Sequence, residues 1–158
     1  ARAFEAAGEA QAAGEVYRAL IRDEPGDAEA VLGLSRLLLT SDNAEAHDMA
    51  VAVLRPLVRM KPDDRRARLA LVGALERKGD TPAAREVLSE ALEESPRDVQ
   101  LRIALAAMLA SDNTSDQLEA AVRELGVAAK VAREDGDEQA GTWCEREAQR
   151  LSSAGERN

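Results

Sequence analysis

A short pattern that returns four times along this chain constrains its fold more than any other feature. In each copy an alanine is followed four positions later by a large apolar residue, in the pairs Ala13/Tyr17, Ala50/Leu54, Ala84/Leu88 and Ala121/Leu125. Eight residues after the large residue come Pro25, Pro62, Pro96 and, in the last copy, Arg133. Residues four apart share one face of a helix, and a proline cannot continue a helix. The pattern therefore predicts four equivalent helices within an internal repeat.

A second helical pattern precedes three of these helices. Pairs of leucines four residues apart mark it, at Leu34/Leu38, Leu71/Leu75 and Leu105/Leu109. In the best-defined repeat the two patterns are joined by Gly79-Asp80-Thr81, which should break the first helix. We expect Thr81 to cap the second helix and Pro82 to lie in its first turn. Each repeat should then be a helix, a tight turn, a second helix and a stop.

These repeats resemble the tetratricopeptide repeat, whose period is about 34 residues and whose signature includes A-x3-F followed by P. The resemblance covers nearly the whole chain, although the tryptophan usual in the first helix is replaced by Val31, Arg68 and Arg102. It implies an all-α, right-handed superhelical solenoid of about four helical hairpins plus a C-terminal capping helix. Because only 2% of the residues are aromatic, close helix contacts should depend on small residues, with Ala84 and Ala121 where helices nearly touch.

The resemblance also implies a repeat array over residues 1–135 and a capping helix with a tail over 136–158. The array comprises a truncated first repeat over 1–26, a second over 27–63, a third over 64–98 and a fourth over 99–135. Its complete helices are expected over 27–40, 44–60, 64–78, 82–94, 98–110 and 115–134. A last helix is expected over 138–152, before a polar, disordered tail. Residues 1–7 are interpreted as half of a first helix, so we expect more sequence upstream; a native short first helix is the alternative.

Local features carry further expectations. Pro56 should kink its helix or remove one hydrogen bond, and Thr114 with Gln117 should form a capping box. The last helix should bury one face made of Ala140, Trp143, Cys144, Ala148 and Leu151.

Two three-residue insertions contain Ser-Asp-Asn, at residues 41–43 and 111–113. We interpret them as tolerated loop variation, with a role in binding as the alternative.

Composition excludes some classes of partner. The net charge is −9, whereas binding to a nucleic-acid backbone needs a basic face. A single cysteine allows no intrachain disulfide, and no apolar run is long enough to span a membrane. Abundant alanine and the excess of arginine over lysine suggest a bacterial protein; its localisation, in the cytoplasm or the periplasm, stays open.

No catalytic or metal-binding constellation is evident in the sequence. His47 is the only histidine; we expect it to be exposed, and no nucleophile or pocket is suggested near it. Cys144 lacks a second cysteine or a histidine with which to bind a metal, and we expect it to be a small buried residue. A calcium-binding loop that started at Asp112 would have glycine at its sixth position and glutamate at its twelfth. This chain has Gln117 and Arg123 there, so no calcium loop is expected. We predict a protein that is not an enzyme and needs no cofactor.

In the family that this chain resembles, the first helix of each repeat lines a concave, protein-binding groove. By that resemblance the groove is lined by Glu29, Leu32, Gly33, Arg36, Leu39 and Thr40 in the second repeat, by Arg66, Leu69, Ala70, Gly73 and Arg77 in the third, and by Gln100, Ile103, Ala104, Ala107 and Ser111 in the fourth. Leu32, Leu69 and Ile103 would form an aliphatic stripe. The glycines and alanines would leave room for a guest, and the arginines would make this face more basic than the rest.

The expected occupant of the groove is a peptide or amphipathic helix of another protein, with some acidic residues. A clamp for a C-terminal carboxylate, used by some relatives, is not expected, because only Arg36 and Gln100 among the matching positions could contact one. The main alternative is self-association in a structural scaffold of a bacterial envelope export or secretion assembly. Regulation of an upstream enzymatic domain is a third hypothesis, since fold alone does not give function.

Overall fold

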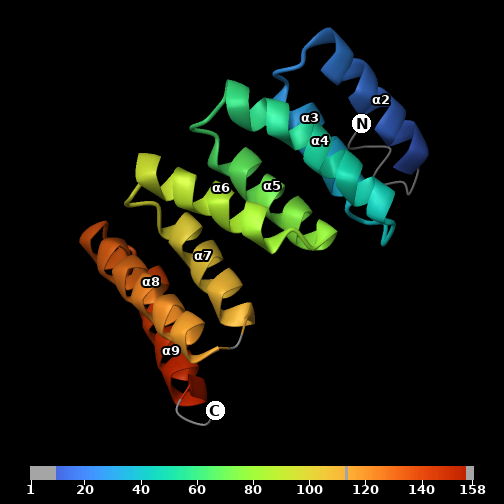
Figure 1. Ribbon diagram of the computed structural model, residues 1–158. Coiled ribbons are helices and arrows are strands. Elements are labelled where there is room, and N and C mark those ends of the chain that lie inside the picture. Colours follow the sequence, from blue (N-terminus) through green and yellow to red (C-terminus); the bar gives the residue numbers. More distant parts are fainter. Residues whose placement is uncertain (1–9, 113, 156–158) are drawn as a thin grey trace. The chain divides into compact units, whose positions relative to one another are not determined.

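The computed structural model describes residues 10–112 and 114–155, and every regular element in this part of the chain is a helix (Figure 1). The helices are α2 (Ala10–Asp23), α3 (Ala28–Leu38), α4 (Ala44–Met60), α5 (Arg65–Lys78), α6 (Thr81–Glu94), α7 (Val99–Ser111), α8 (Ser115–Glu134) and α9 (Glu138–Gly155). The predicted all-α fold is confirmed, and the helix bounds agree closely with those expected. The half-helix expected over residues 1–7 lies outside the described residues.

Polar side chains determine where most of these helices begin. The Asp64 carboxylate accepts hydrogen bonds from the backbone N–H groups of Arg66 and Ala67, at 2.9 and 3.2 Å. Asp98 caps α7 with two such hydrogen bonds, and Asp27 and Asn43 cap α3 and α4 with one each. Such caps satisfy backbone donors that a helix start leaves without an intrahelical partner.

The cap of α6 differs from the one expected. Gly79 ends α5 in the left-handed region, with φ 83°, which a glycine adopts without steric cost. Asp80 then accepts from the Ala83 N–H at 3.2 Å, and Thr81 is already the first helical residue. The turn is therefore confirmed, but Asp80 rather than Thr81 caps the helix. At α8 one half of the expected capping box is present, because the Thr114 hydroxyl accepts from the Gln117 N–H at 3.4 Å.

The chain divides into two compact units, Ala1–Val87 and Leu88–Asn158. In the first unit α2 packs on α3, α3 on α4 and α4 on α5, and α3 also contacts α5. The repeated pairs Ala13/Tyr17 and Ala50/Leu54 are buried here, which explains why their spacing recurs. α4 continues through Pro56, whose nitrogen has no hydrogen to donate.

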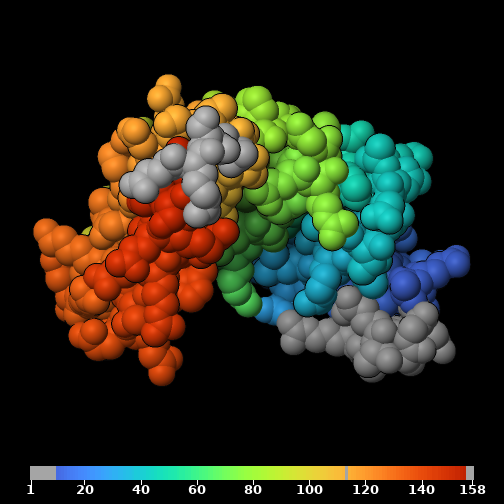
Figure 2. All heavy atoms as spheres, turned by 90° about the horizontal axis from the view of Figure 1, so that it is seen from below, coloured from blue at the N-terminus to red at the C-terminus, as the bar shows by residue number. Residues whose placement is uncertain are grey.

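In the second unit α7 packs on α8 and α8 on α9; Figure 2 shows the atoms of α8 in orange and those of α9 in red. Ala121 and Leu125 lie in its core with Leu109, Ala128 and Cys144. The fourth recurring pair, Ala84/Leu88, is also fully buried. All four pairs therefore face the interior, as predicted. The division into repeats at the residues given above stays a prediction.

Two expectations about the C-terminus are wrong. Trp143 does not join the buried face of α9, since half of it is exposed, whereas its neighbour Cys144 is fully buried as predicted. α9 also continues through Gly155, so residues 152–155 are helical rather than part of a disordered tail. Leu151 is buried against the core of this unit, and that contact anchors the last turns. Residues 156–158 lie outside the described residues.

Candidate functional site

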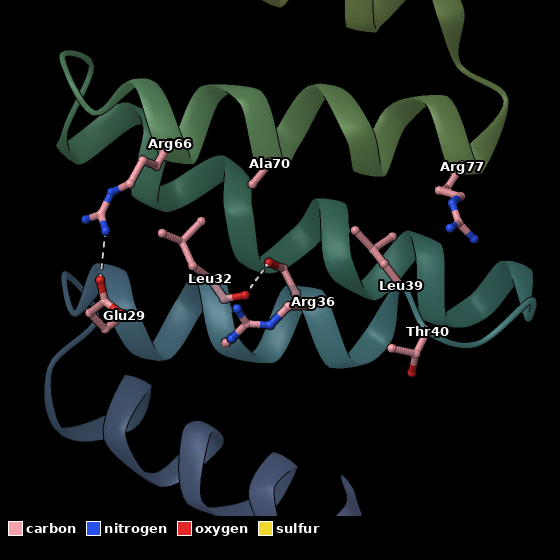
Figure 3. A pocket seen from close by; sticks show the side chains of 10 residues that line it. Glu29, Leu32, Arg36, Leu39, Thr40, Arg66, Ala70 and Arg77 are labelled. Atoms are coloured by element: carbon pink, nitrogen blue, oxygen red, sulfur yellow. Dashed lines mark hydrogen bonds and ion pairs between the residues drawn. The ribbon is translucent and has the colours of Figure 1, made fainter. Parts of the chain in front are cut away.

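A hollow of about 600 Å³ in the first unit lies over α3 and α5 (Figure 3). Its lining residues are Glu29, Leu32, Gly33, Ser35, Arg36, Leu39, Thr40, Arg66, Ala70 and Arg77. The structure thus brings together every residue expected to line the groove in the second repeat and, from the third, Arg66, Ala70 and Arg77. Leu69 and Gly73, also expected there, are half-buried on α5 but do not line the hollow.

The two helices place their first turns at the same end of the hollow. There Arg66 Nη1 of α5 donates to Glu29 Oε1 of α3 across 2.8 Å. Arg36 and Arg77 lie in the last turns of α3 and α5, and Figure 3 shows Arg77 beside Leu39 and Thr40 at the opposite end. The hollow therefore has two distinct ends, which the helix directions define.

Apolar side chains lie between these ends. Leu32 of α3, Leu39 at the C-cap of α3 and Ala70 of α5 are each half-buried, so part of their apolar surface still contacts solvent. Below them Ser35 is buried, and its hydroxyl donates to the Leu32 carbonyl oxygen at 3.0 Å. The hydroxyl is thus satisfied within its own helix and adds no unpaired polar group to the floor.

Gly33 does not leave room for a guest, contrary to the expectation from sequence. It is buried, and a Cβ placed on it would lie 2.3 Å from Cζ of Tyr17 and 2.5 Å from its Cε1. Tyr17 belongs to α2 and packs in the core of the first unit. The Tyr17 ring therefore occupies the space that a side chain at position 33 would need. Gly33 allows α2 and α3 to pack closely.

The charged residues that line the hollow are three arginines and one glutamate, in a chain whose net charge is −9. The hydrogen bond to Glu29, reinforced by the nearby charge of Asp64, raises the pKa of Arg66 above its ordinary value. Arg77 Nη1 lies 3.8 Å from Asp42 Oδ1, and both side chains are exposed. The hollow is thus locally basic on an acidic protein.

The residues expected from the fourth repeat lie on α7, in the second unit. Gln100 and Ala107 are exposed, and Ile103 and Ala104 are half-buried. Ile103 packs in part against the core of this unit, so some of its side chain serves the interior. An aliphatic stripe running through Leu32, Leu69 and Ile103 stays a prediction.

The expectation that His47 is exposed is wrong. Only 8% of the residue is accessible, and its Nε2 lies within hydrogen-bond distance, 2.8 Å, of the Ser41 carbonyl oxygen. Ser41 belongs to the three-residue insertion before α4, and Asn43 of the same insertion caps α4. Sequence reasoning also missed Asp42, which this insertion places beside Arg77. Of the second insertion, Asn113 lies outside the described residues.

Comparison with known proteins identifies the family. A family model of the tetratricopeptide repeat matches residues 1–47 and 47–99. The chain belongs to the tetratricopeptide repeat family. Proteins built from this repeat are helical solenoids that generally mediate protein–protein interactions and are generally non-enzymatic scaffolds. The resemblance inferred from the recurring Ala/large pairs is therefore confirmed.

Solved structures share the fold at low sequence identity. MamA residues 41 to the end from Desulfovibrio magneticus RS-1 is 16% identical, with a TM-score of 0.61, over 97% of this chain and 91% of that one. Another MamA structure is 14% identical, with a TM-score of 0.58, over 98% and 95% of the two chains. A tetratricopeptide repeat protein from Parabacteroides merdae is 15% identical, with a TM-score of 0.57, over 94% of this chain and 61% of that one. No curated protein matches this chain in sequence.

Across residues 10–112 and 114–155, no helix has both the length and the apolar character needed to cross a bilayer.

Proposed function

We propose that this chain is a protein-binding module that docks a short segment of another protein, a peptide or the face of a helix, in the hollow between α3 and α5. The observation that carries the proposal is the lining of this hollow, in which partly exposed Leu32, Leu39 and Ala70 lie among charged side chains. Half-buried apolar surface gains free energy when a partner removes it from water.

The size of the hollow limits what can occupy it. A volume of about 600 Å³ is in the range of pockets that hold small ligands or a few side chains. Leu39, the C-cap residue of α3, follows Leu32 by seven residues, about 10 Å along the helix axis. That distance matches two turns of a partner helix or about three residues of an extended peptide. A short segment therefore fits better than a broad, flat protein surface.

Site-specific photocrosslinking tests this proposal. A photoreactive amino acid at Ala70, inside the hollow, is compared with the same amino acid at Met49, an exposed residue of α4 outside the lining. In cells of the source organism we expect a crosslinked partner protein from position 70 and not from position 49. Leu39→Arg, which puts a long charged side chain into the hollow, should abolish the adduct while circular dichroism shows the fold retained.

The other outcomes also decide the question. Equal crosslinking from both positions, or an adduct at position 70 that survives Leu39→Arg, would contradict docking in the hollow. An adduct whose mass is twice that of the chain would instead favour the alternative of a self-associating scaffold.

A further inference from the structure

We propose that the second unit carries a docking groove of its own, on α8 and α9, and that its occupant is a basic, amphipathic helix of another protein. This inference goes beyond the proposed function, because the groove lies in a different unit from the hollow over α3 and α5. The apolar lining of the groove and the negative charge of the second unit both favour such a helix.

The groove has a volume of about 450 Å³ and lies along the first half of α8 and the end of α9. Its lining residues are Ser115, Leu118, Glu119, Val122, Arg123, Leu151, Ser152 and Gly155. Leu118 and Leu151 are buried, whereas Val122 and Gly155 are half-buried. A Cβ on Gly155 would lie 3.9 Å from Cδ1 of Leu118, an ordinary van der Waals distance, so this end of the groove has room for an added side chain.

The charge of the chain is unevenly distributed between the two units. Residues 88–158 contain 15 acidic and 8 basic side chains, a net charge of −7, whereas residues 1–87 carry −2. In the described part of the second unit, six of the seven lysines and arginines already form ion pairs. The excess of carboxylates should attract a positively charged partner and repel an acidic one.

Two carboxylates lie at the rim of the groove itself. Glu119 belongs to the lining, and Asp116 precedes it by three residues, on the same side of α8. Both residues are exposed. Arg123 Nη1 lies 3.9 Å from Glu119 Oε2, and both side chains are exposed, so this pair contributes little and is easily rearranged. A lysine or arginine of the partner can therefore bind Glu119 and Asp116 beside the apolar lining.

The spacing along α8 defines the pattern expected in the partner. Leu118 and Val122 are one helical turn apart, about 6 Å along the axis, and the lining from Ser115 to Arg123 spans about 12 Å. A partner helix of about two turns matches this length. We expect it to carry apolar residues three or four positions apart, with lysine or arginine on the side that faces Glu119.

Helix electrostatics offer a different reason for these charges. Asp116 lies in the first turn of α8, where the helix dipole favours an anion even without a partner. Glu119 and Arg123 are four residues apart, a spacing at which opposite charges stabilise a helix. Those roles predict a loss of stability on substitution but no effect on binding. Binding and stability must therefore be measured on the same variants.

Selection from a random peptide library tests the inference. Peptides of about 16 residues, long enough for about four helical turns, are displayed on phage and selected against the whole chain. Ser152→Trp places a large side chain in the groove at an exposed position, and it identifies the enriched peptides that bind there. Leu39→Arg identifies those that bind in the hollow of the first unit instead.

The role of charge is tested with a matched pair of variants. Asp116→Lys/Glu119→Lys reverses the charge at the rim of the groove. Glu90→Lys/Glu93→Lys is the control, because both are exposed residues of α6 outside the lining and their replacement changes the net charge equally. Circular dichroism and urea unfolding verify that each variant is folded.

We expect the peptides blocked by Ser152→Trp to combine lysine or arginine with apolar residues at helical spacing. They should lose affinity about tenfold or more with the reversed rim and change less than about twofold with the control, because like charges brought together oppose binding strongly. Groove-binding peptides that are neutral or acidic, or that tolerate the reversed rim, would overturn the basic partner.

Two other outcomes would overturn docking of another protein in this groove. One is that no enriched peptide is blocked by Ser152→Trp. The other is a concentration-dependent mass of the free chain that Ser152→Trp abolishes, which would assign the groove to a second copy of the chain. Neither outcome affects the proposed function, because Leu39→Arg and crosslinking at position 70 test the hollow separately.

Discussion

Replacing Gly33 by alanine is the sharpest test of how the first unit is packed. The added Cβ would lie 2.3 Å from Cζ and 2.7 Å from Oη of Tyr17, distances that no folded protein tolerates without movement. Tyr17 is only 3% exposed and packs with Ala13, Ala30 and Leu34. The ring therefore has little room to retreat, and the strain must spread into the contact between α2 and α3.

Two opposing effects determine how much Gly33→Ala changes the free energy of unfolding. Overpacking a buried contact costs about 1–3 kcal/mol, whereas alanine is favoured over glycine inside a helix by about 1 kcal/mol. Gly33→Ala should therefore range from nearly neutral to destabilising by about 2 kcal/mol. Gly73 on α5 and Gly126 on α8 have no atom within 4 Å of an added Cβ. Substituting alanine at either should stabilise the protein by about 1 kcal/mol, so the contrast with Gly33 is about 1–3 kcal/mol.

Urea unfolding followed by circular dichroism measures these differences, and a double-mutant cycle assigns them to the tyrosine. In a Tyr17→Leu background, whose smaller side chain leaves space beside position 33, Gly33→Ala should become stabilising like Gly73→Ala. The coupling free energy between the two positions should then be at least about 1 kcal/mol. Equal stabilisation by Gly33→Ala and Gly73→Ala in the wild-type background, or zero coupling to Tyr17, would refute this account of Gly33.

Three further predictions concern other parts of the chain. Asp64→Ala removes the acceptor of two backbone hydrogen bonds and should lower the free energy of unfolding by about 1 kcal/mol, measured by urea unfolding, with little change for Asp64→Asn. Ala121→Leu, at a fully buried contact of the second unit, should cost about 1–3 kcal/mol by overpacking, and an unchanged urea midpoint would refute this. The hydrogen bond from Arg150 lowers the pKa of Glu147 below its ordinary value, so this pair should contribute stability above about pH 4.5 that is lost as the pH falls through the lowered pKa. In an NMR titration Arg150→Gln should move the Glu147 pKa back up.

The interior of the repeats was the most predictable part of this fold. Ala13 and Tyr17, like Ala121 and Leu125, are buried because residues four apart occupy one face of a helix. The sequence also carries a signal for helix starts. An aspartate follows two residues after each of Pro25, Pro62 and Pro96, and all three aspartates cap the next helix. A recurring Pro-x-Asp thus indicates both the end of one helix and the start of another.

The rotation of a helix about its own axis was harder to predict. Trp143 and Cys144 are adjacent and differ by about 100° in direction, and either could have faced the core. A Cβ on Gly141 would lie 2.8 Å from Cγ of Arg133, so α8 lies close to the face of α9 that carries Gly141. Cys144, three residues further on, is buried on that face. Hydrophobicity placed both Trp143 and Cys144 on the buried face, whereas only Cys144 lies there.

The candidate site was partly predictable, because residues four apart lie on one face of a helix. Helical spacing placed Leu32 and Arg36 on one face of α3, and both line the hollow together with Arg66, Ala70 and Arg77. Leu69 and Gly73 were expected beside them because the resemblance fixes a position within a repeat. It does not fix how far each side chain is covered, which depends on the contacts between helices.

The insertion at residues 41–43 explains why one end of the hollow could not be derived from repeat spacing at all. The Ser41 carbonyl oxygen lies 2.8 Å from His47 Nε2, Asn43 caps α4, and Asp42 Oδ1 lies 3.8 Å from Arg77 Nη1. In the third repeat the corresponding turn is made by Gly79 and Asp80 and has no extra residues. One loop therefore fixes a helix start, supplies a hydrogen-bond partner to an imidazole and adds a carboxylate beside the hollow. Because these effects depend on the length and path of the loop, they lie outside any pattern that the repeats share.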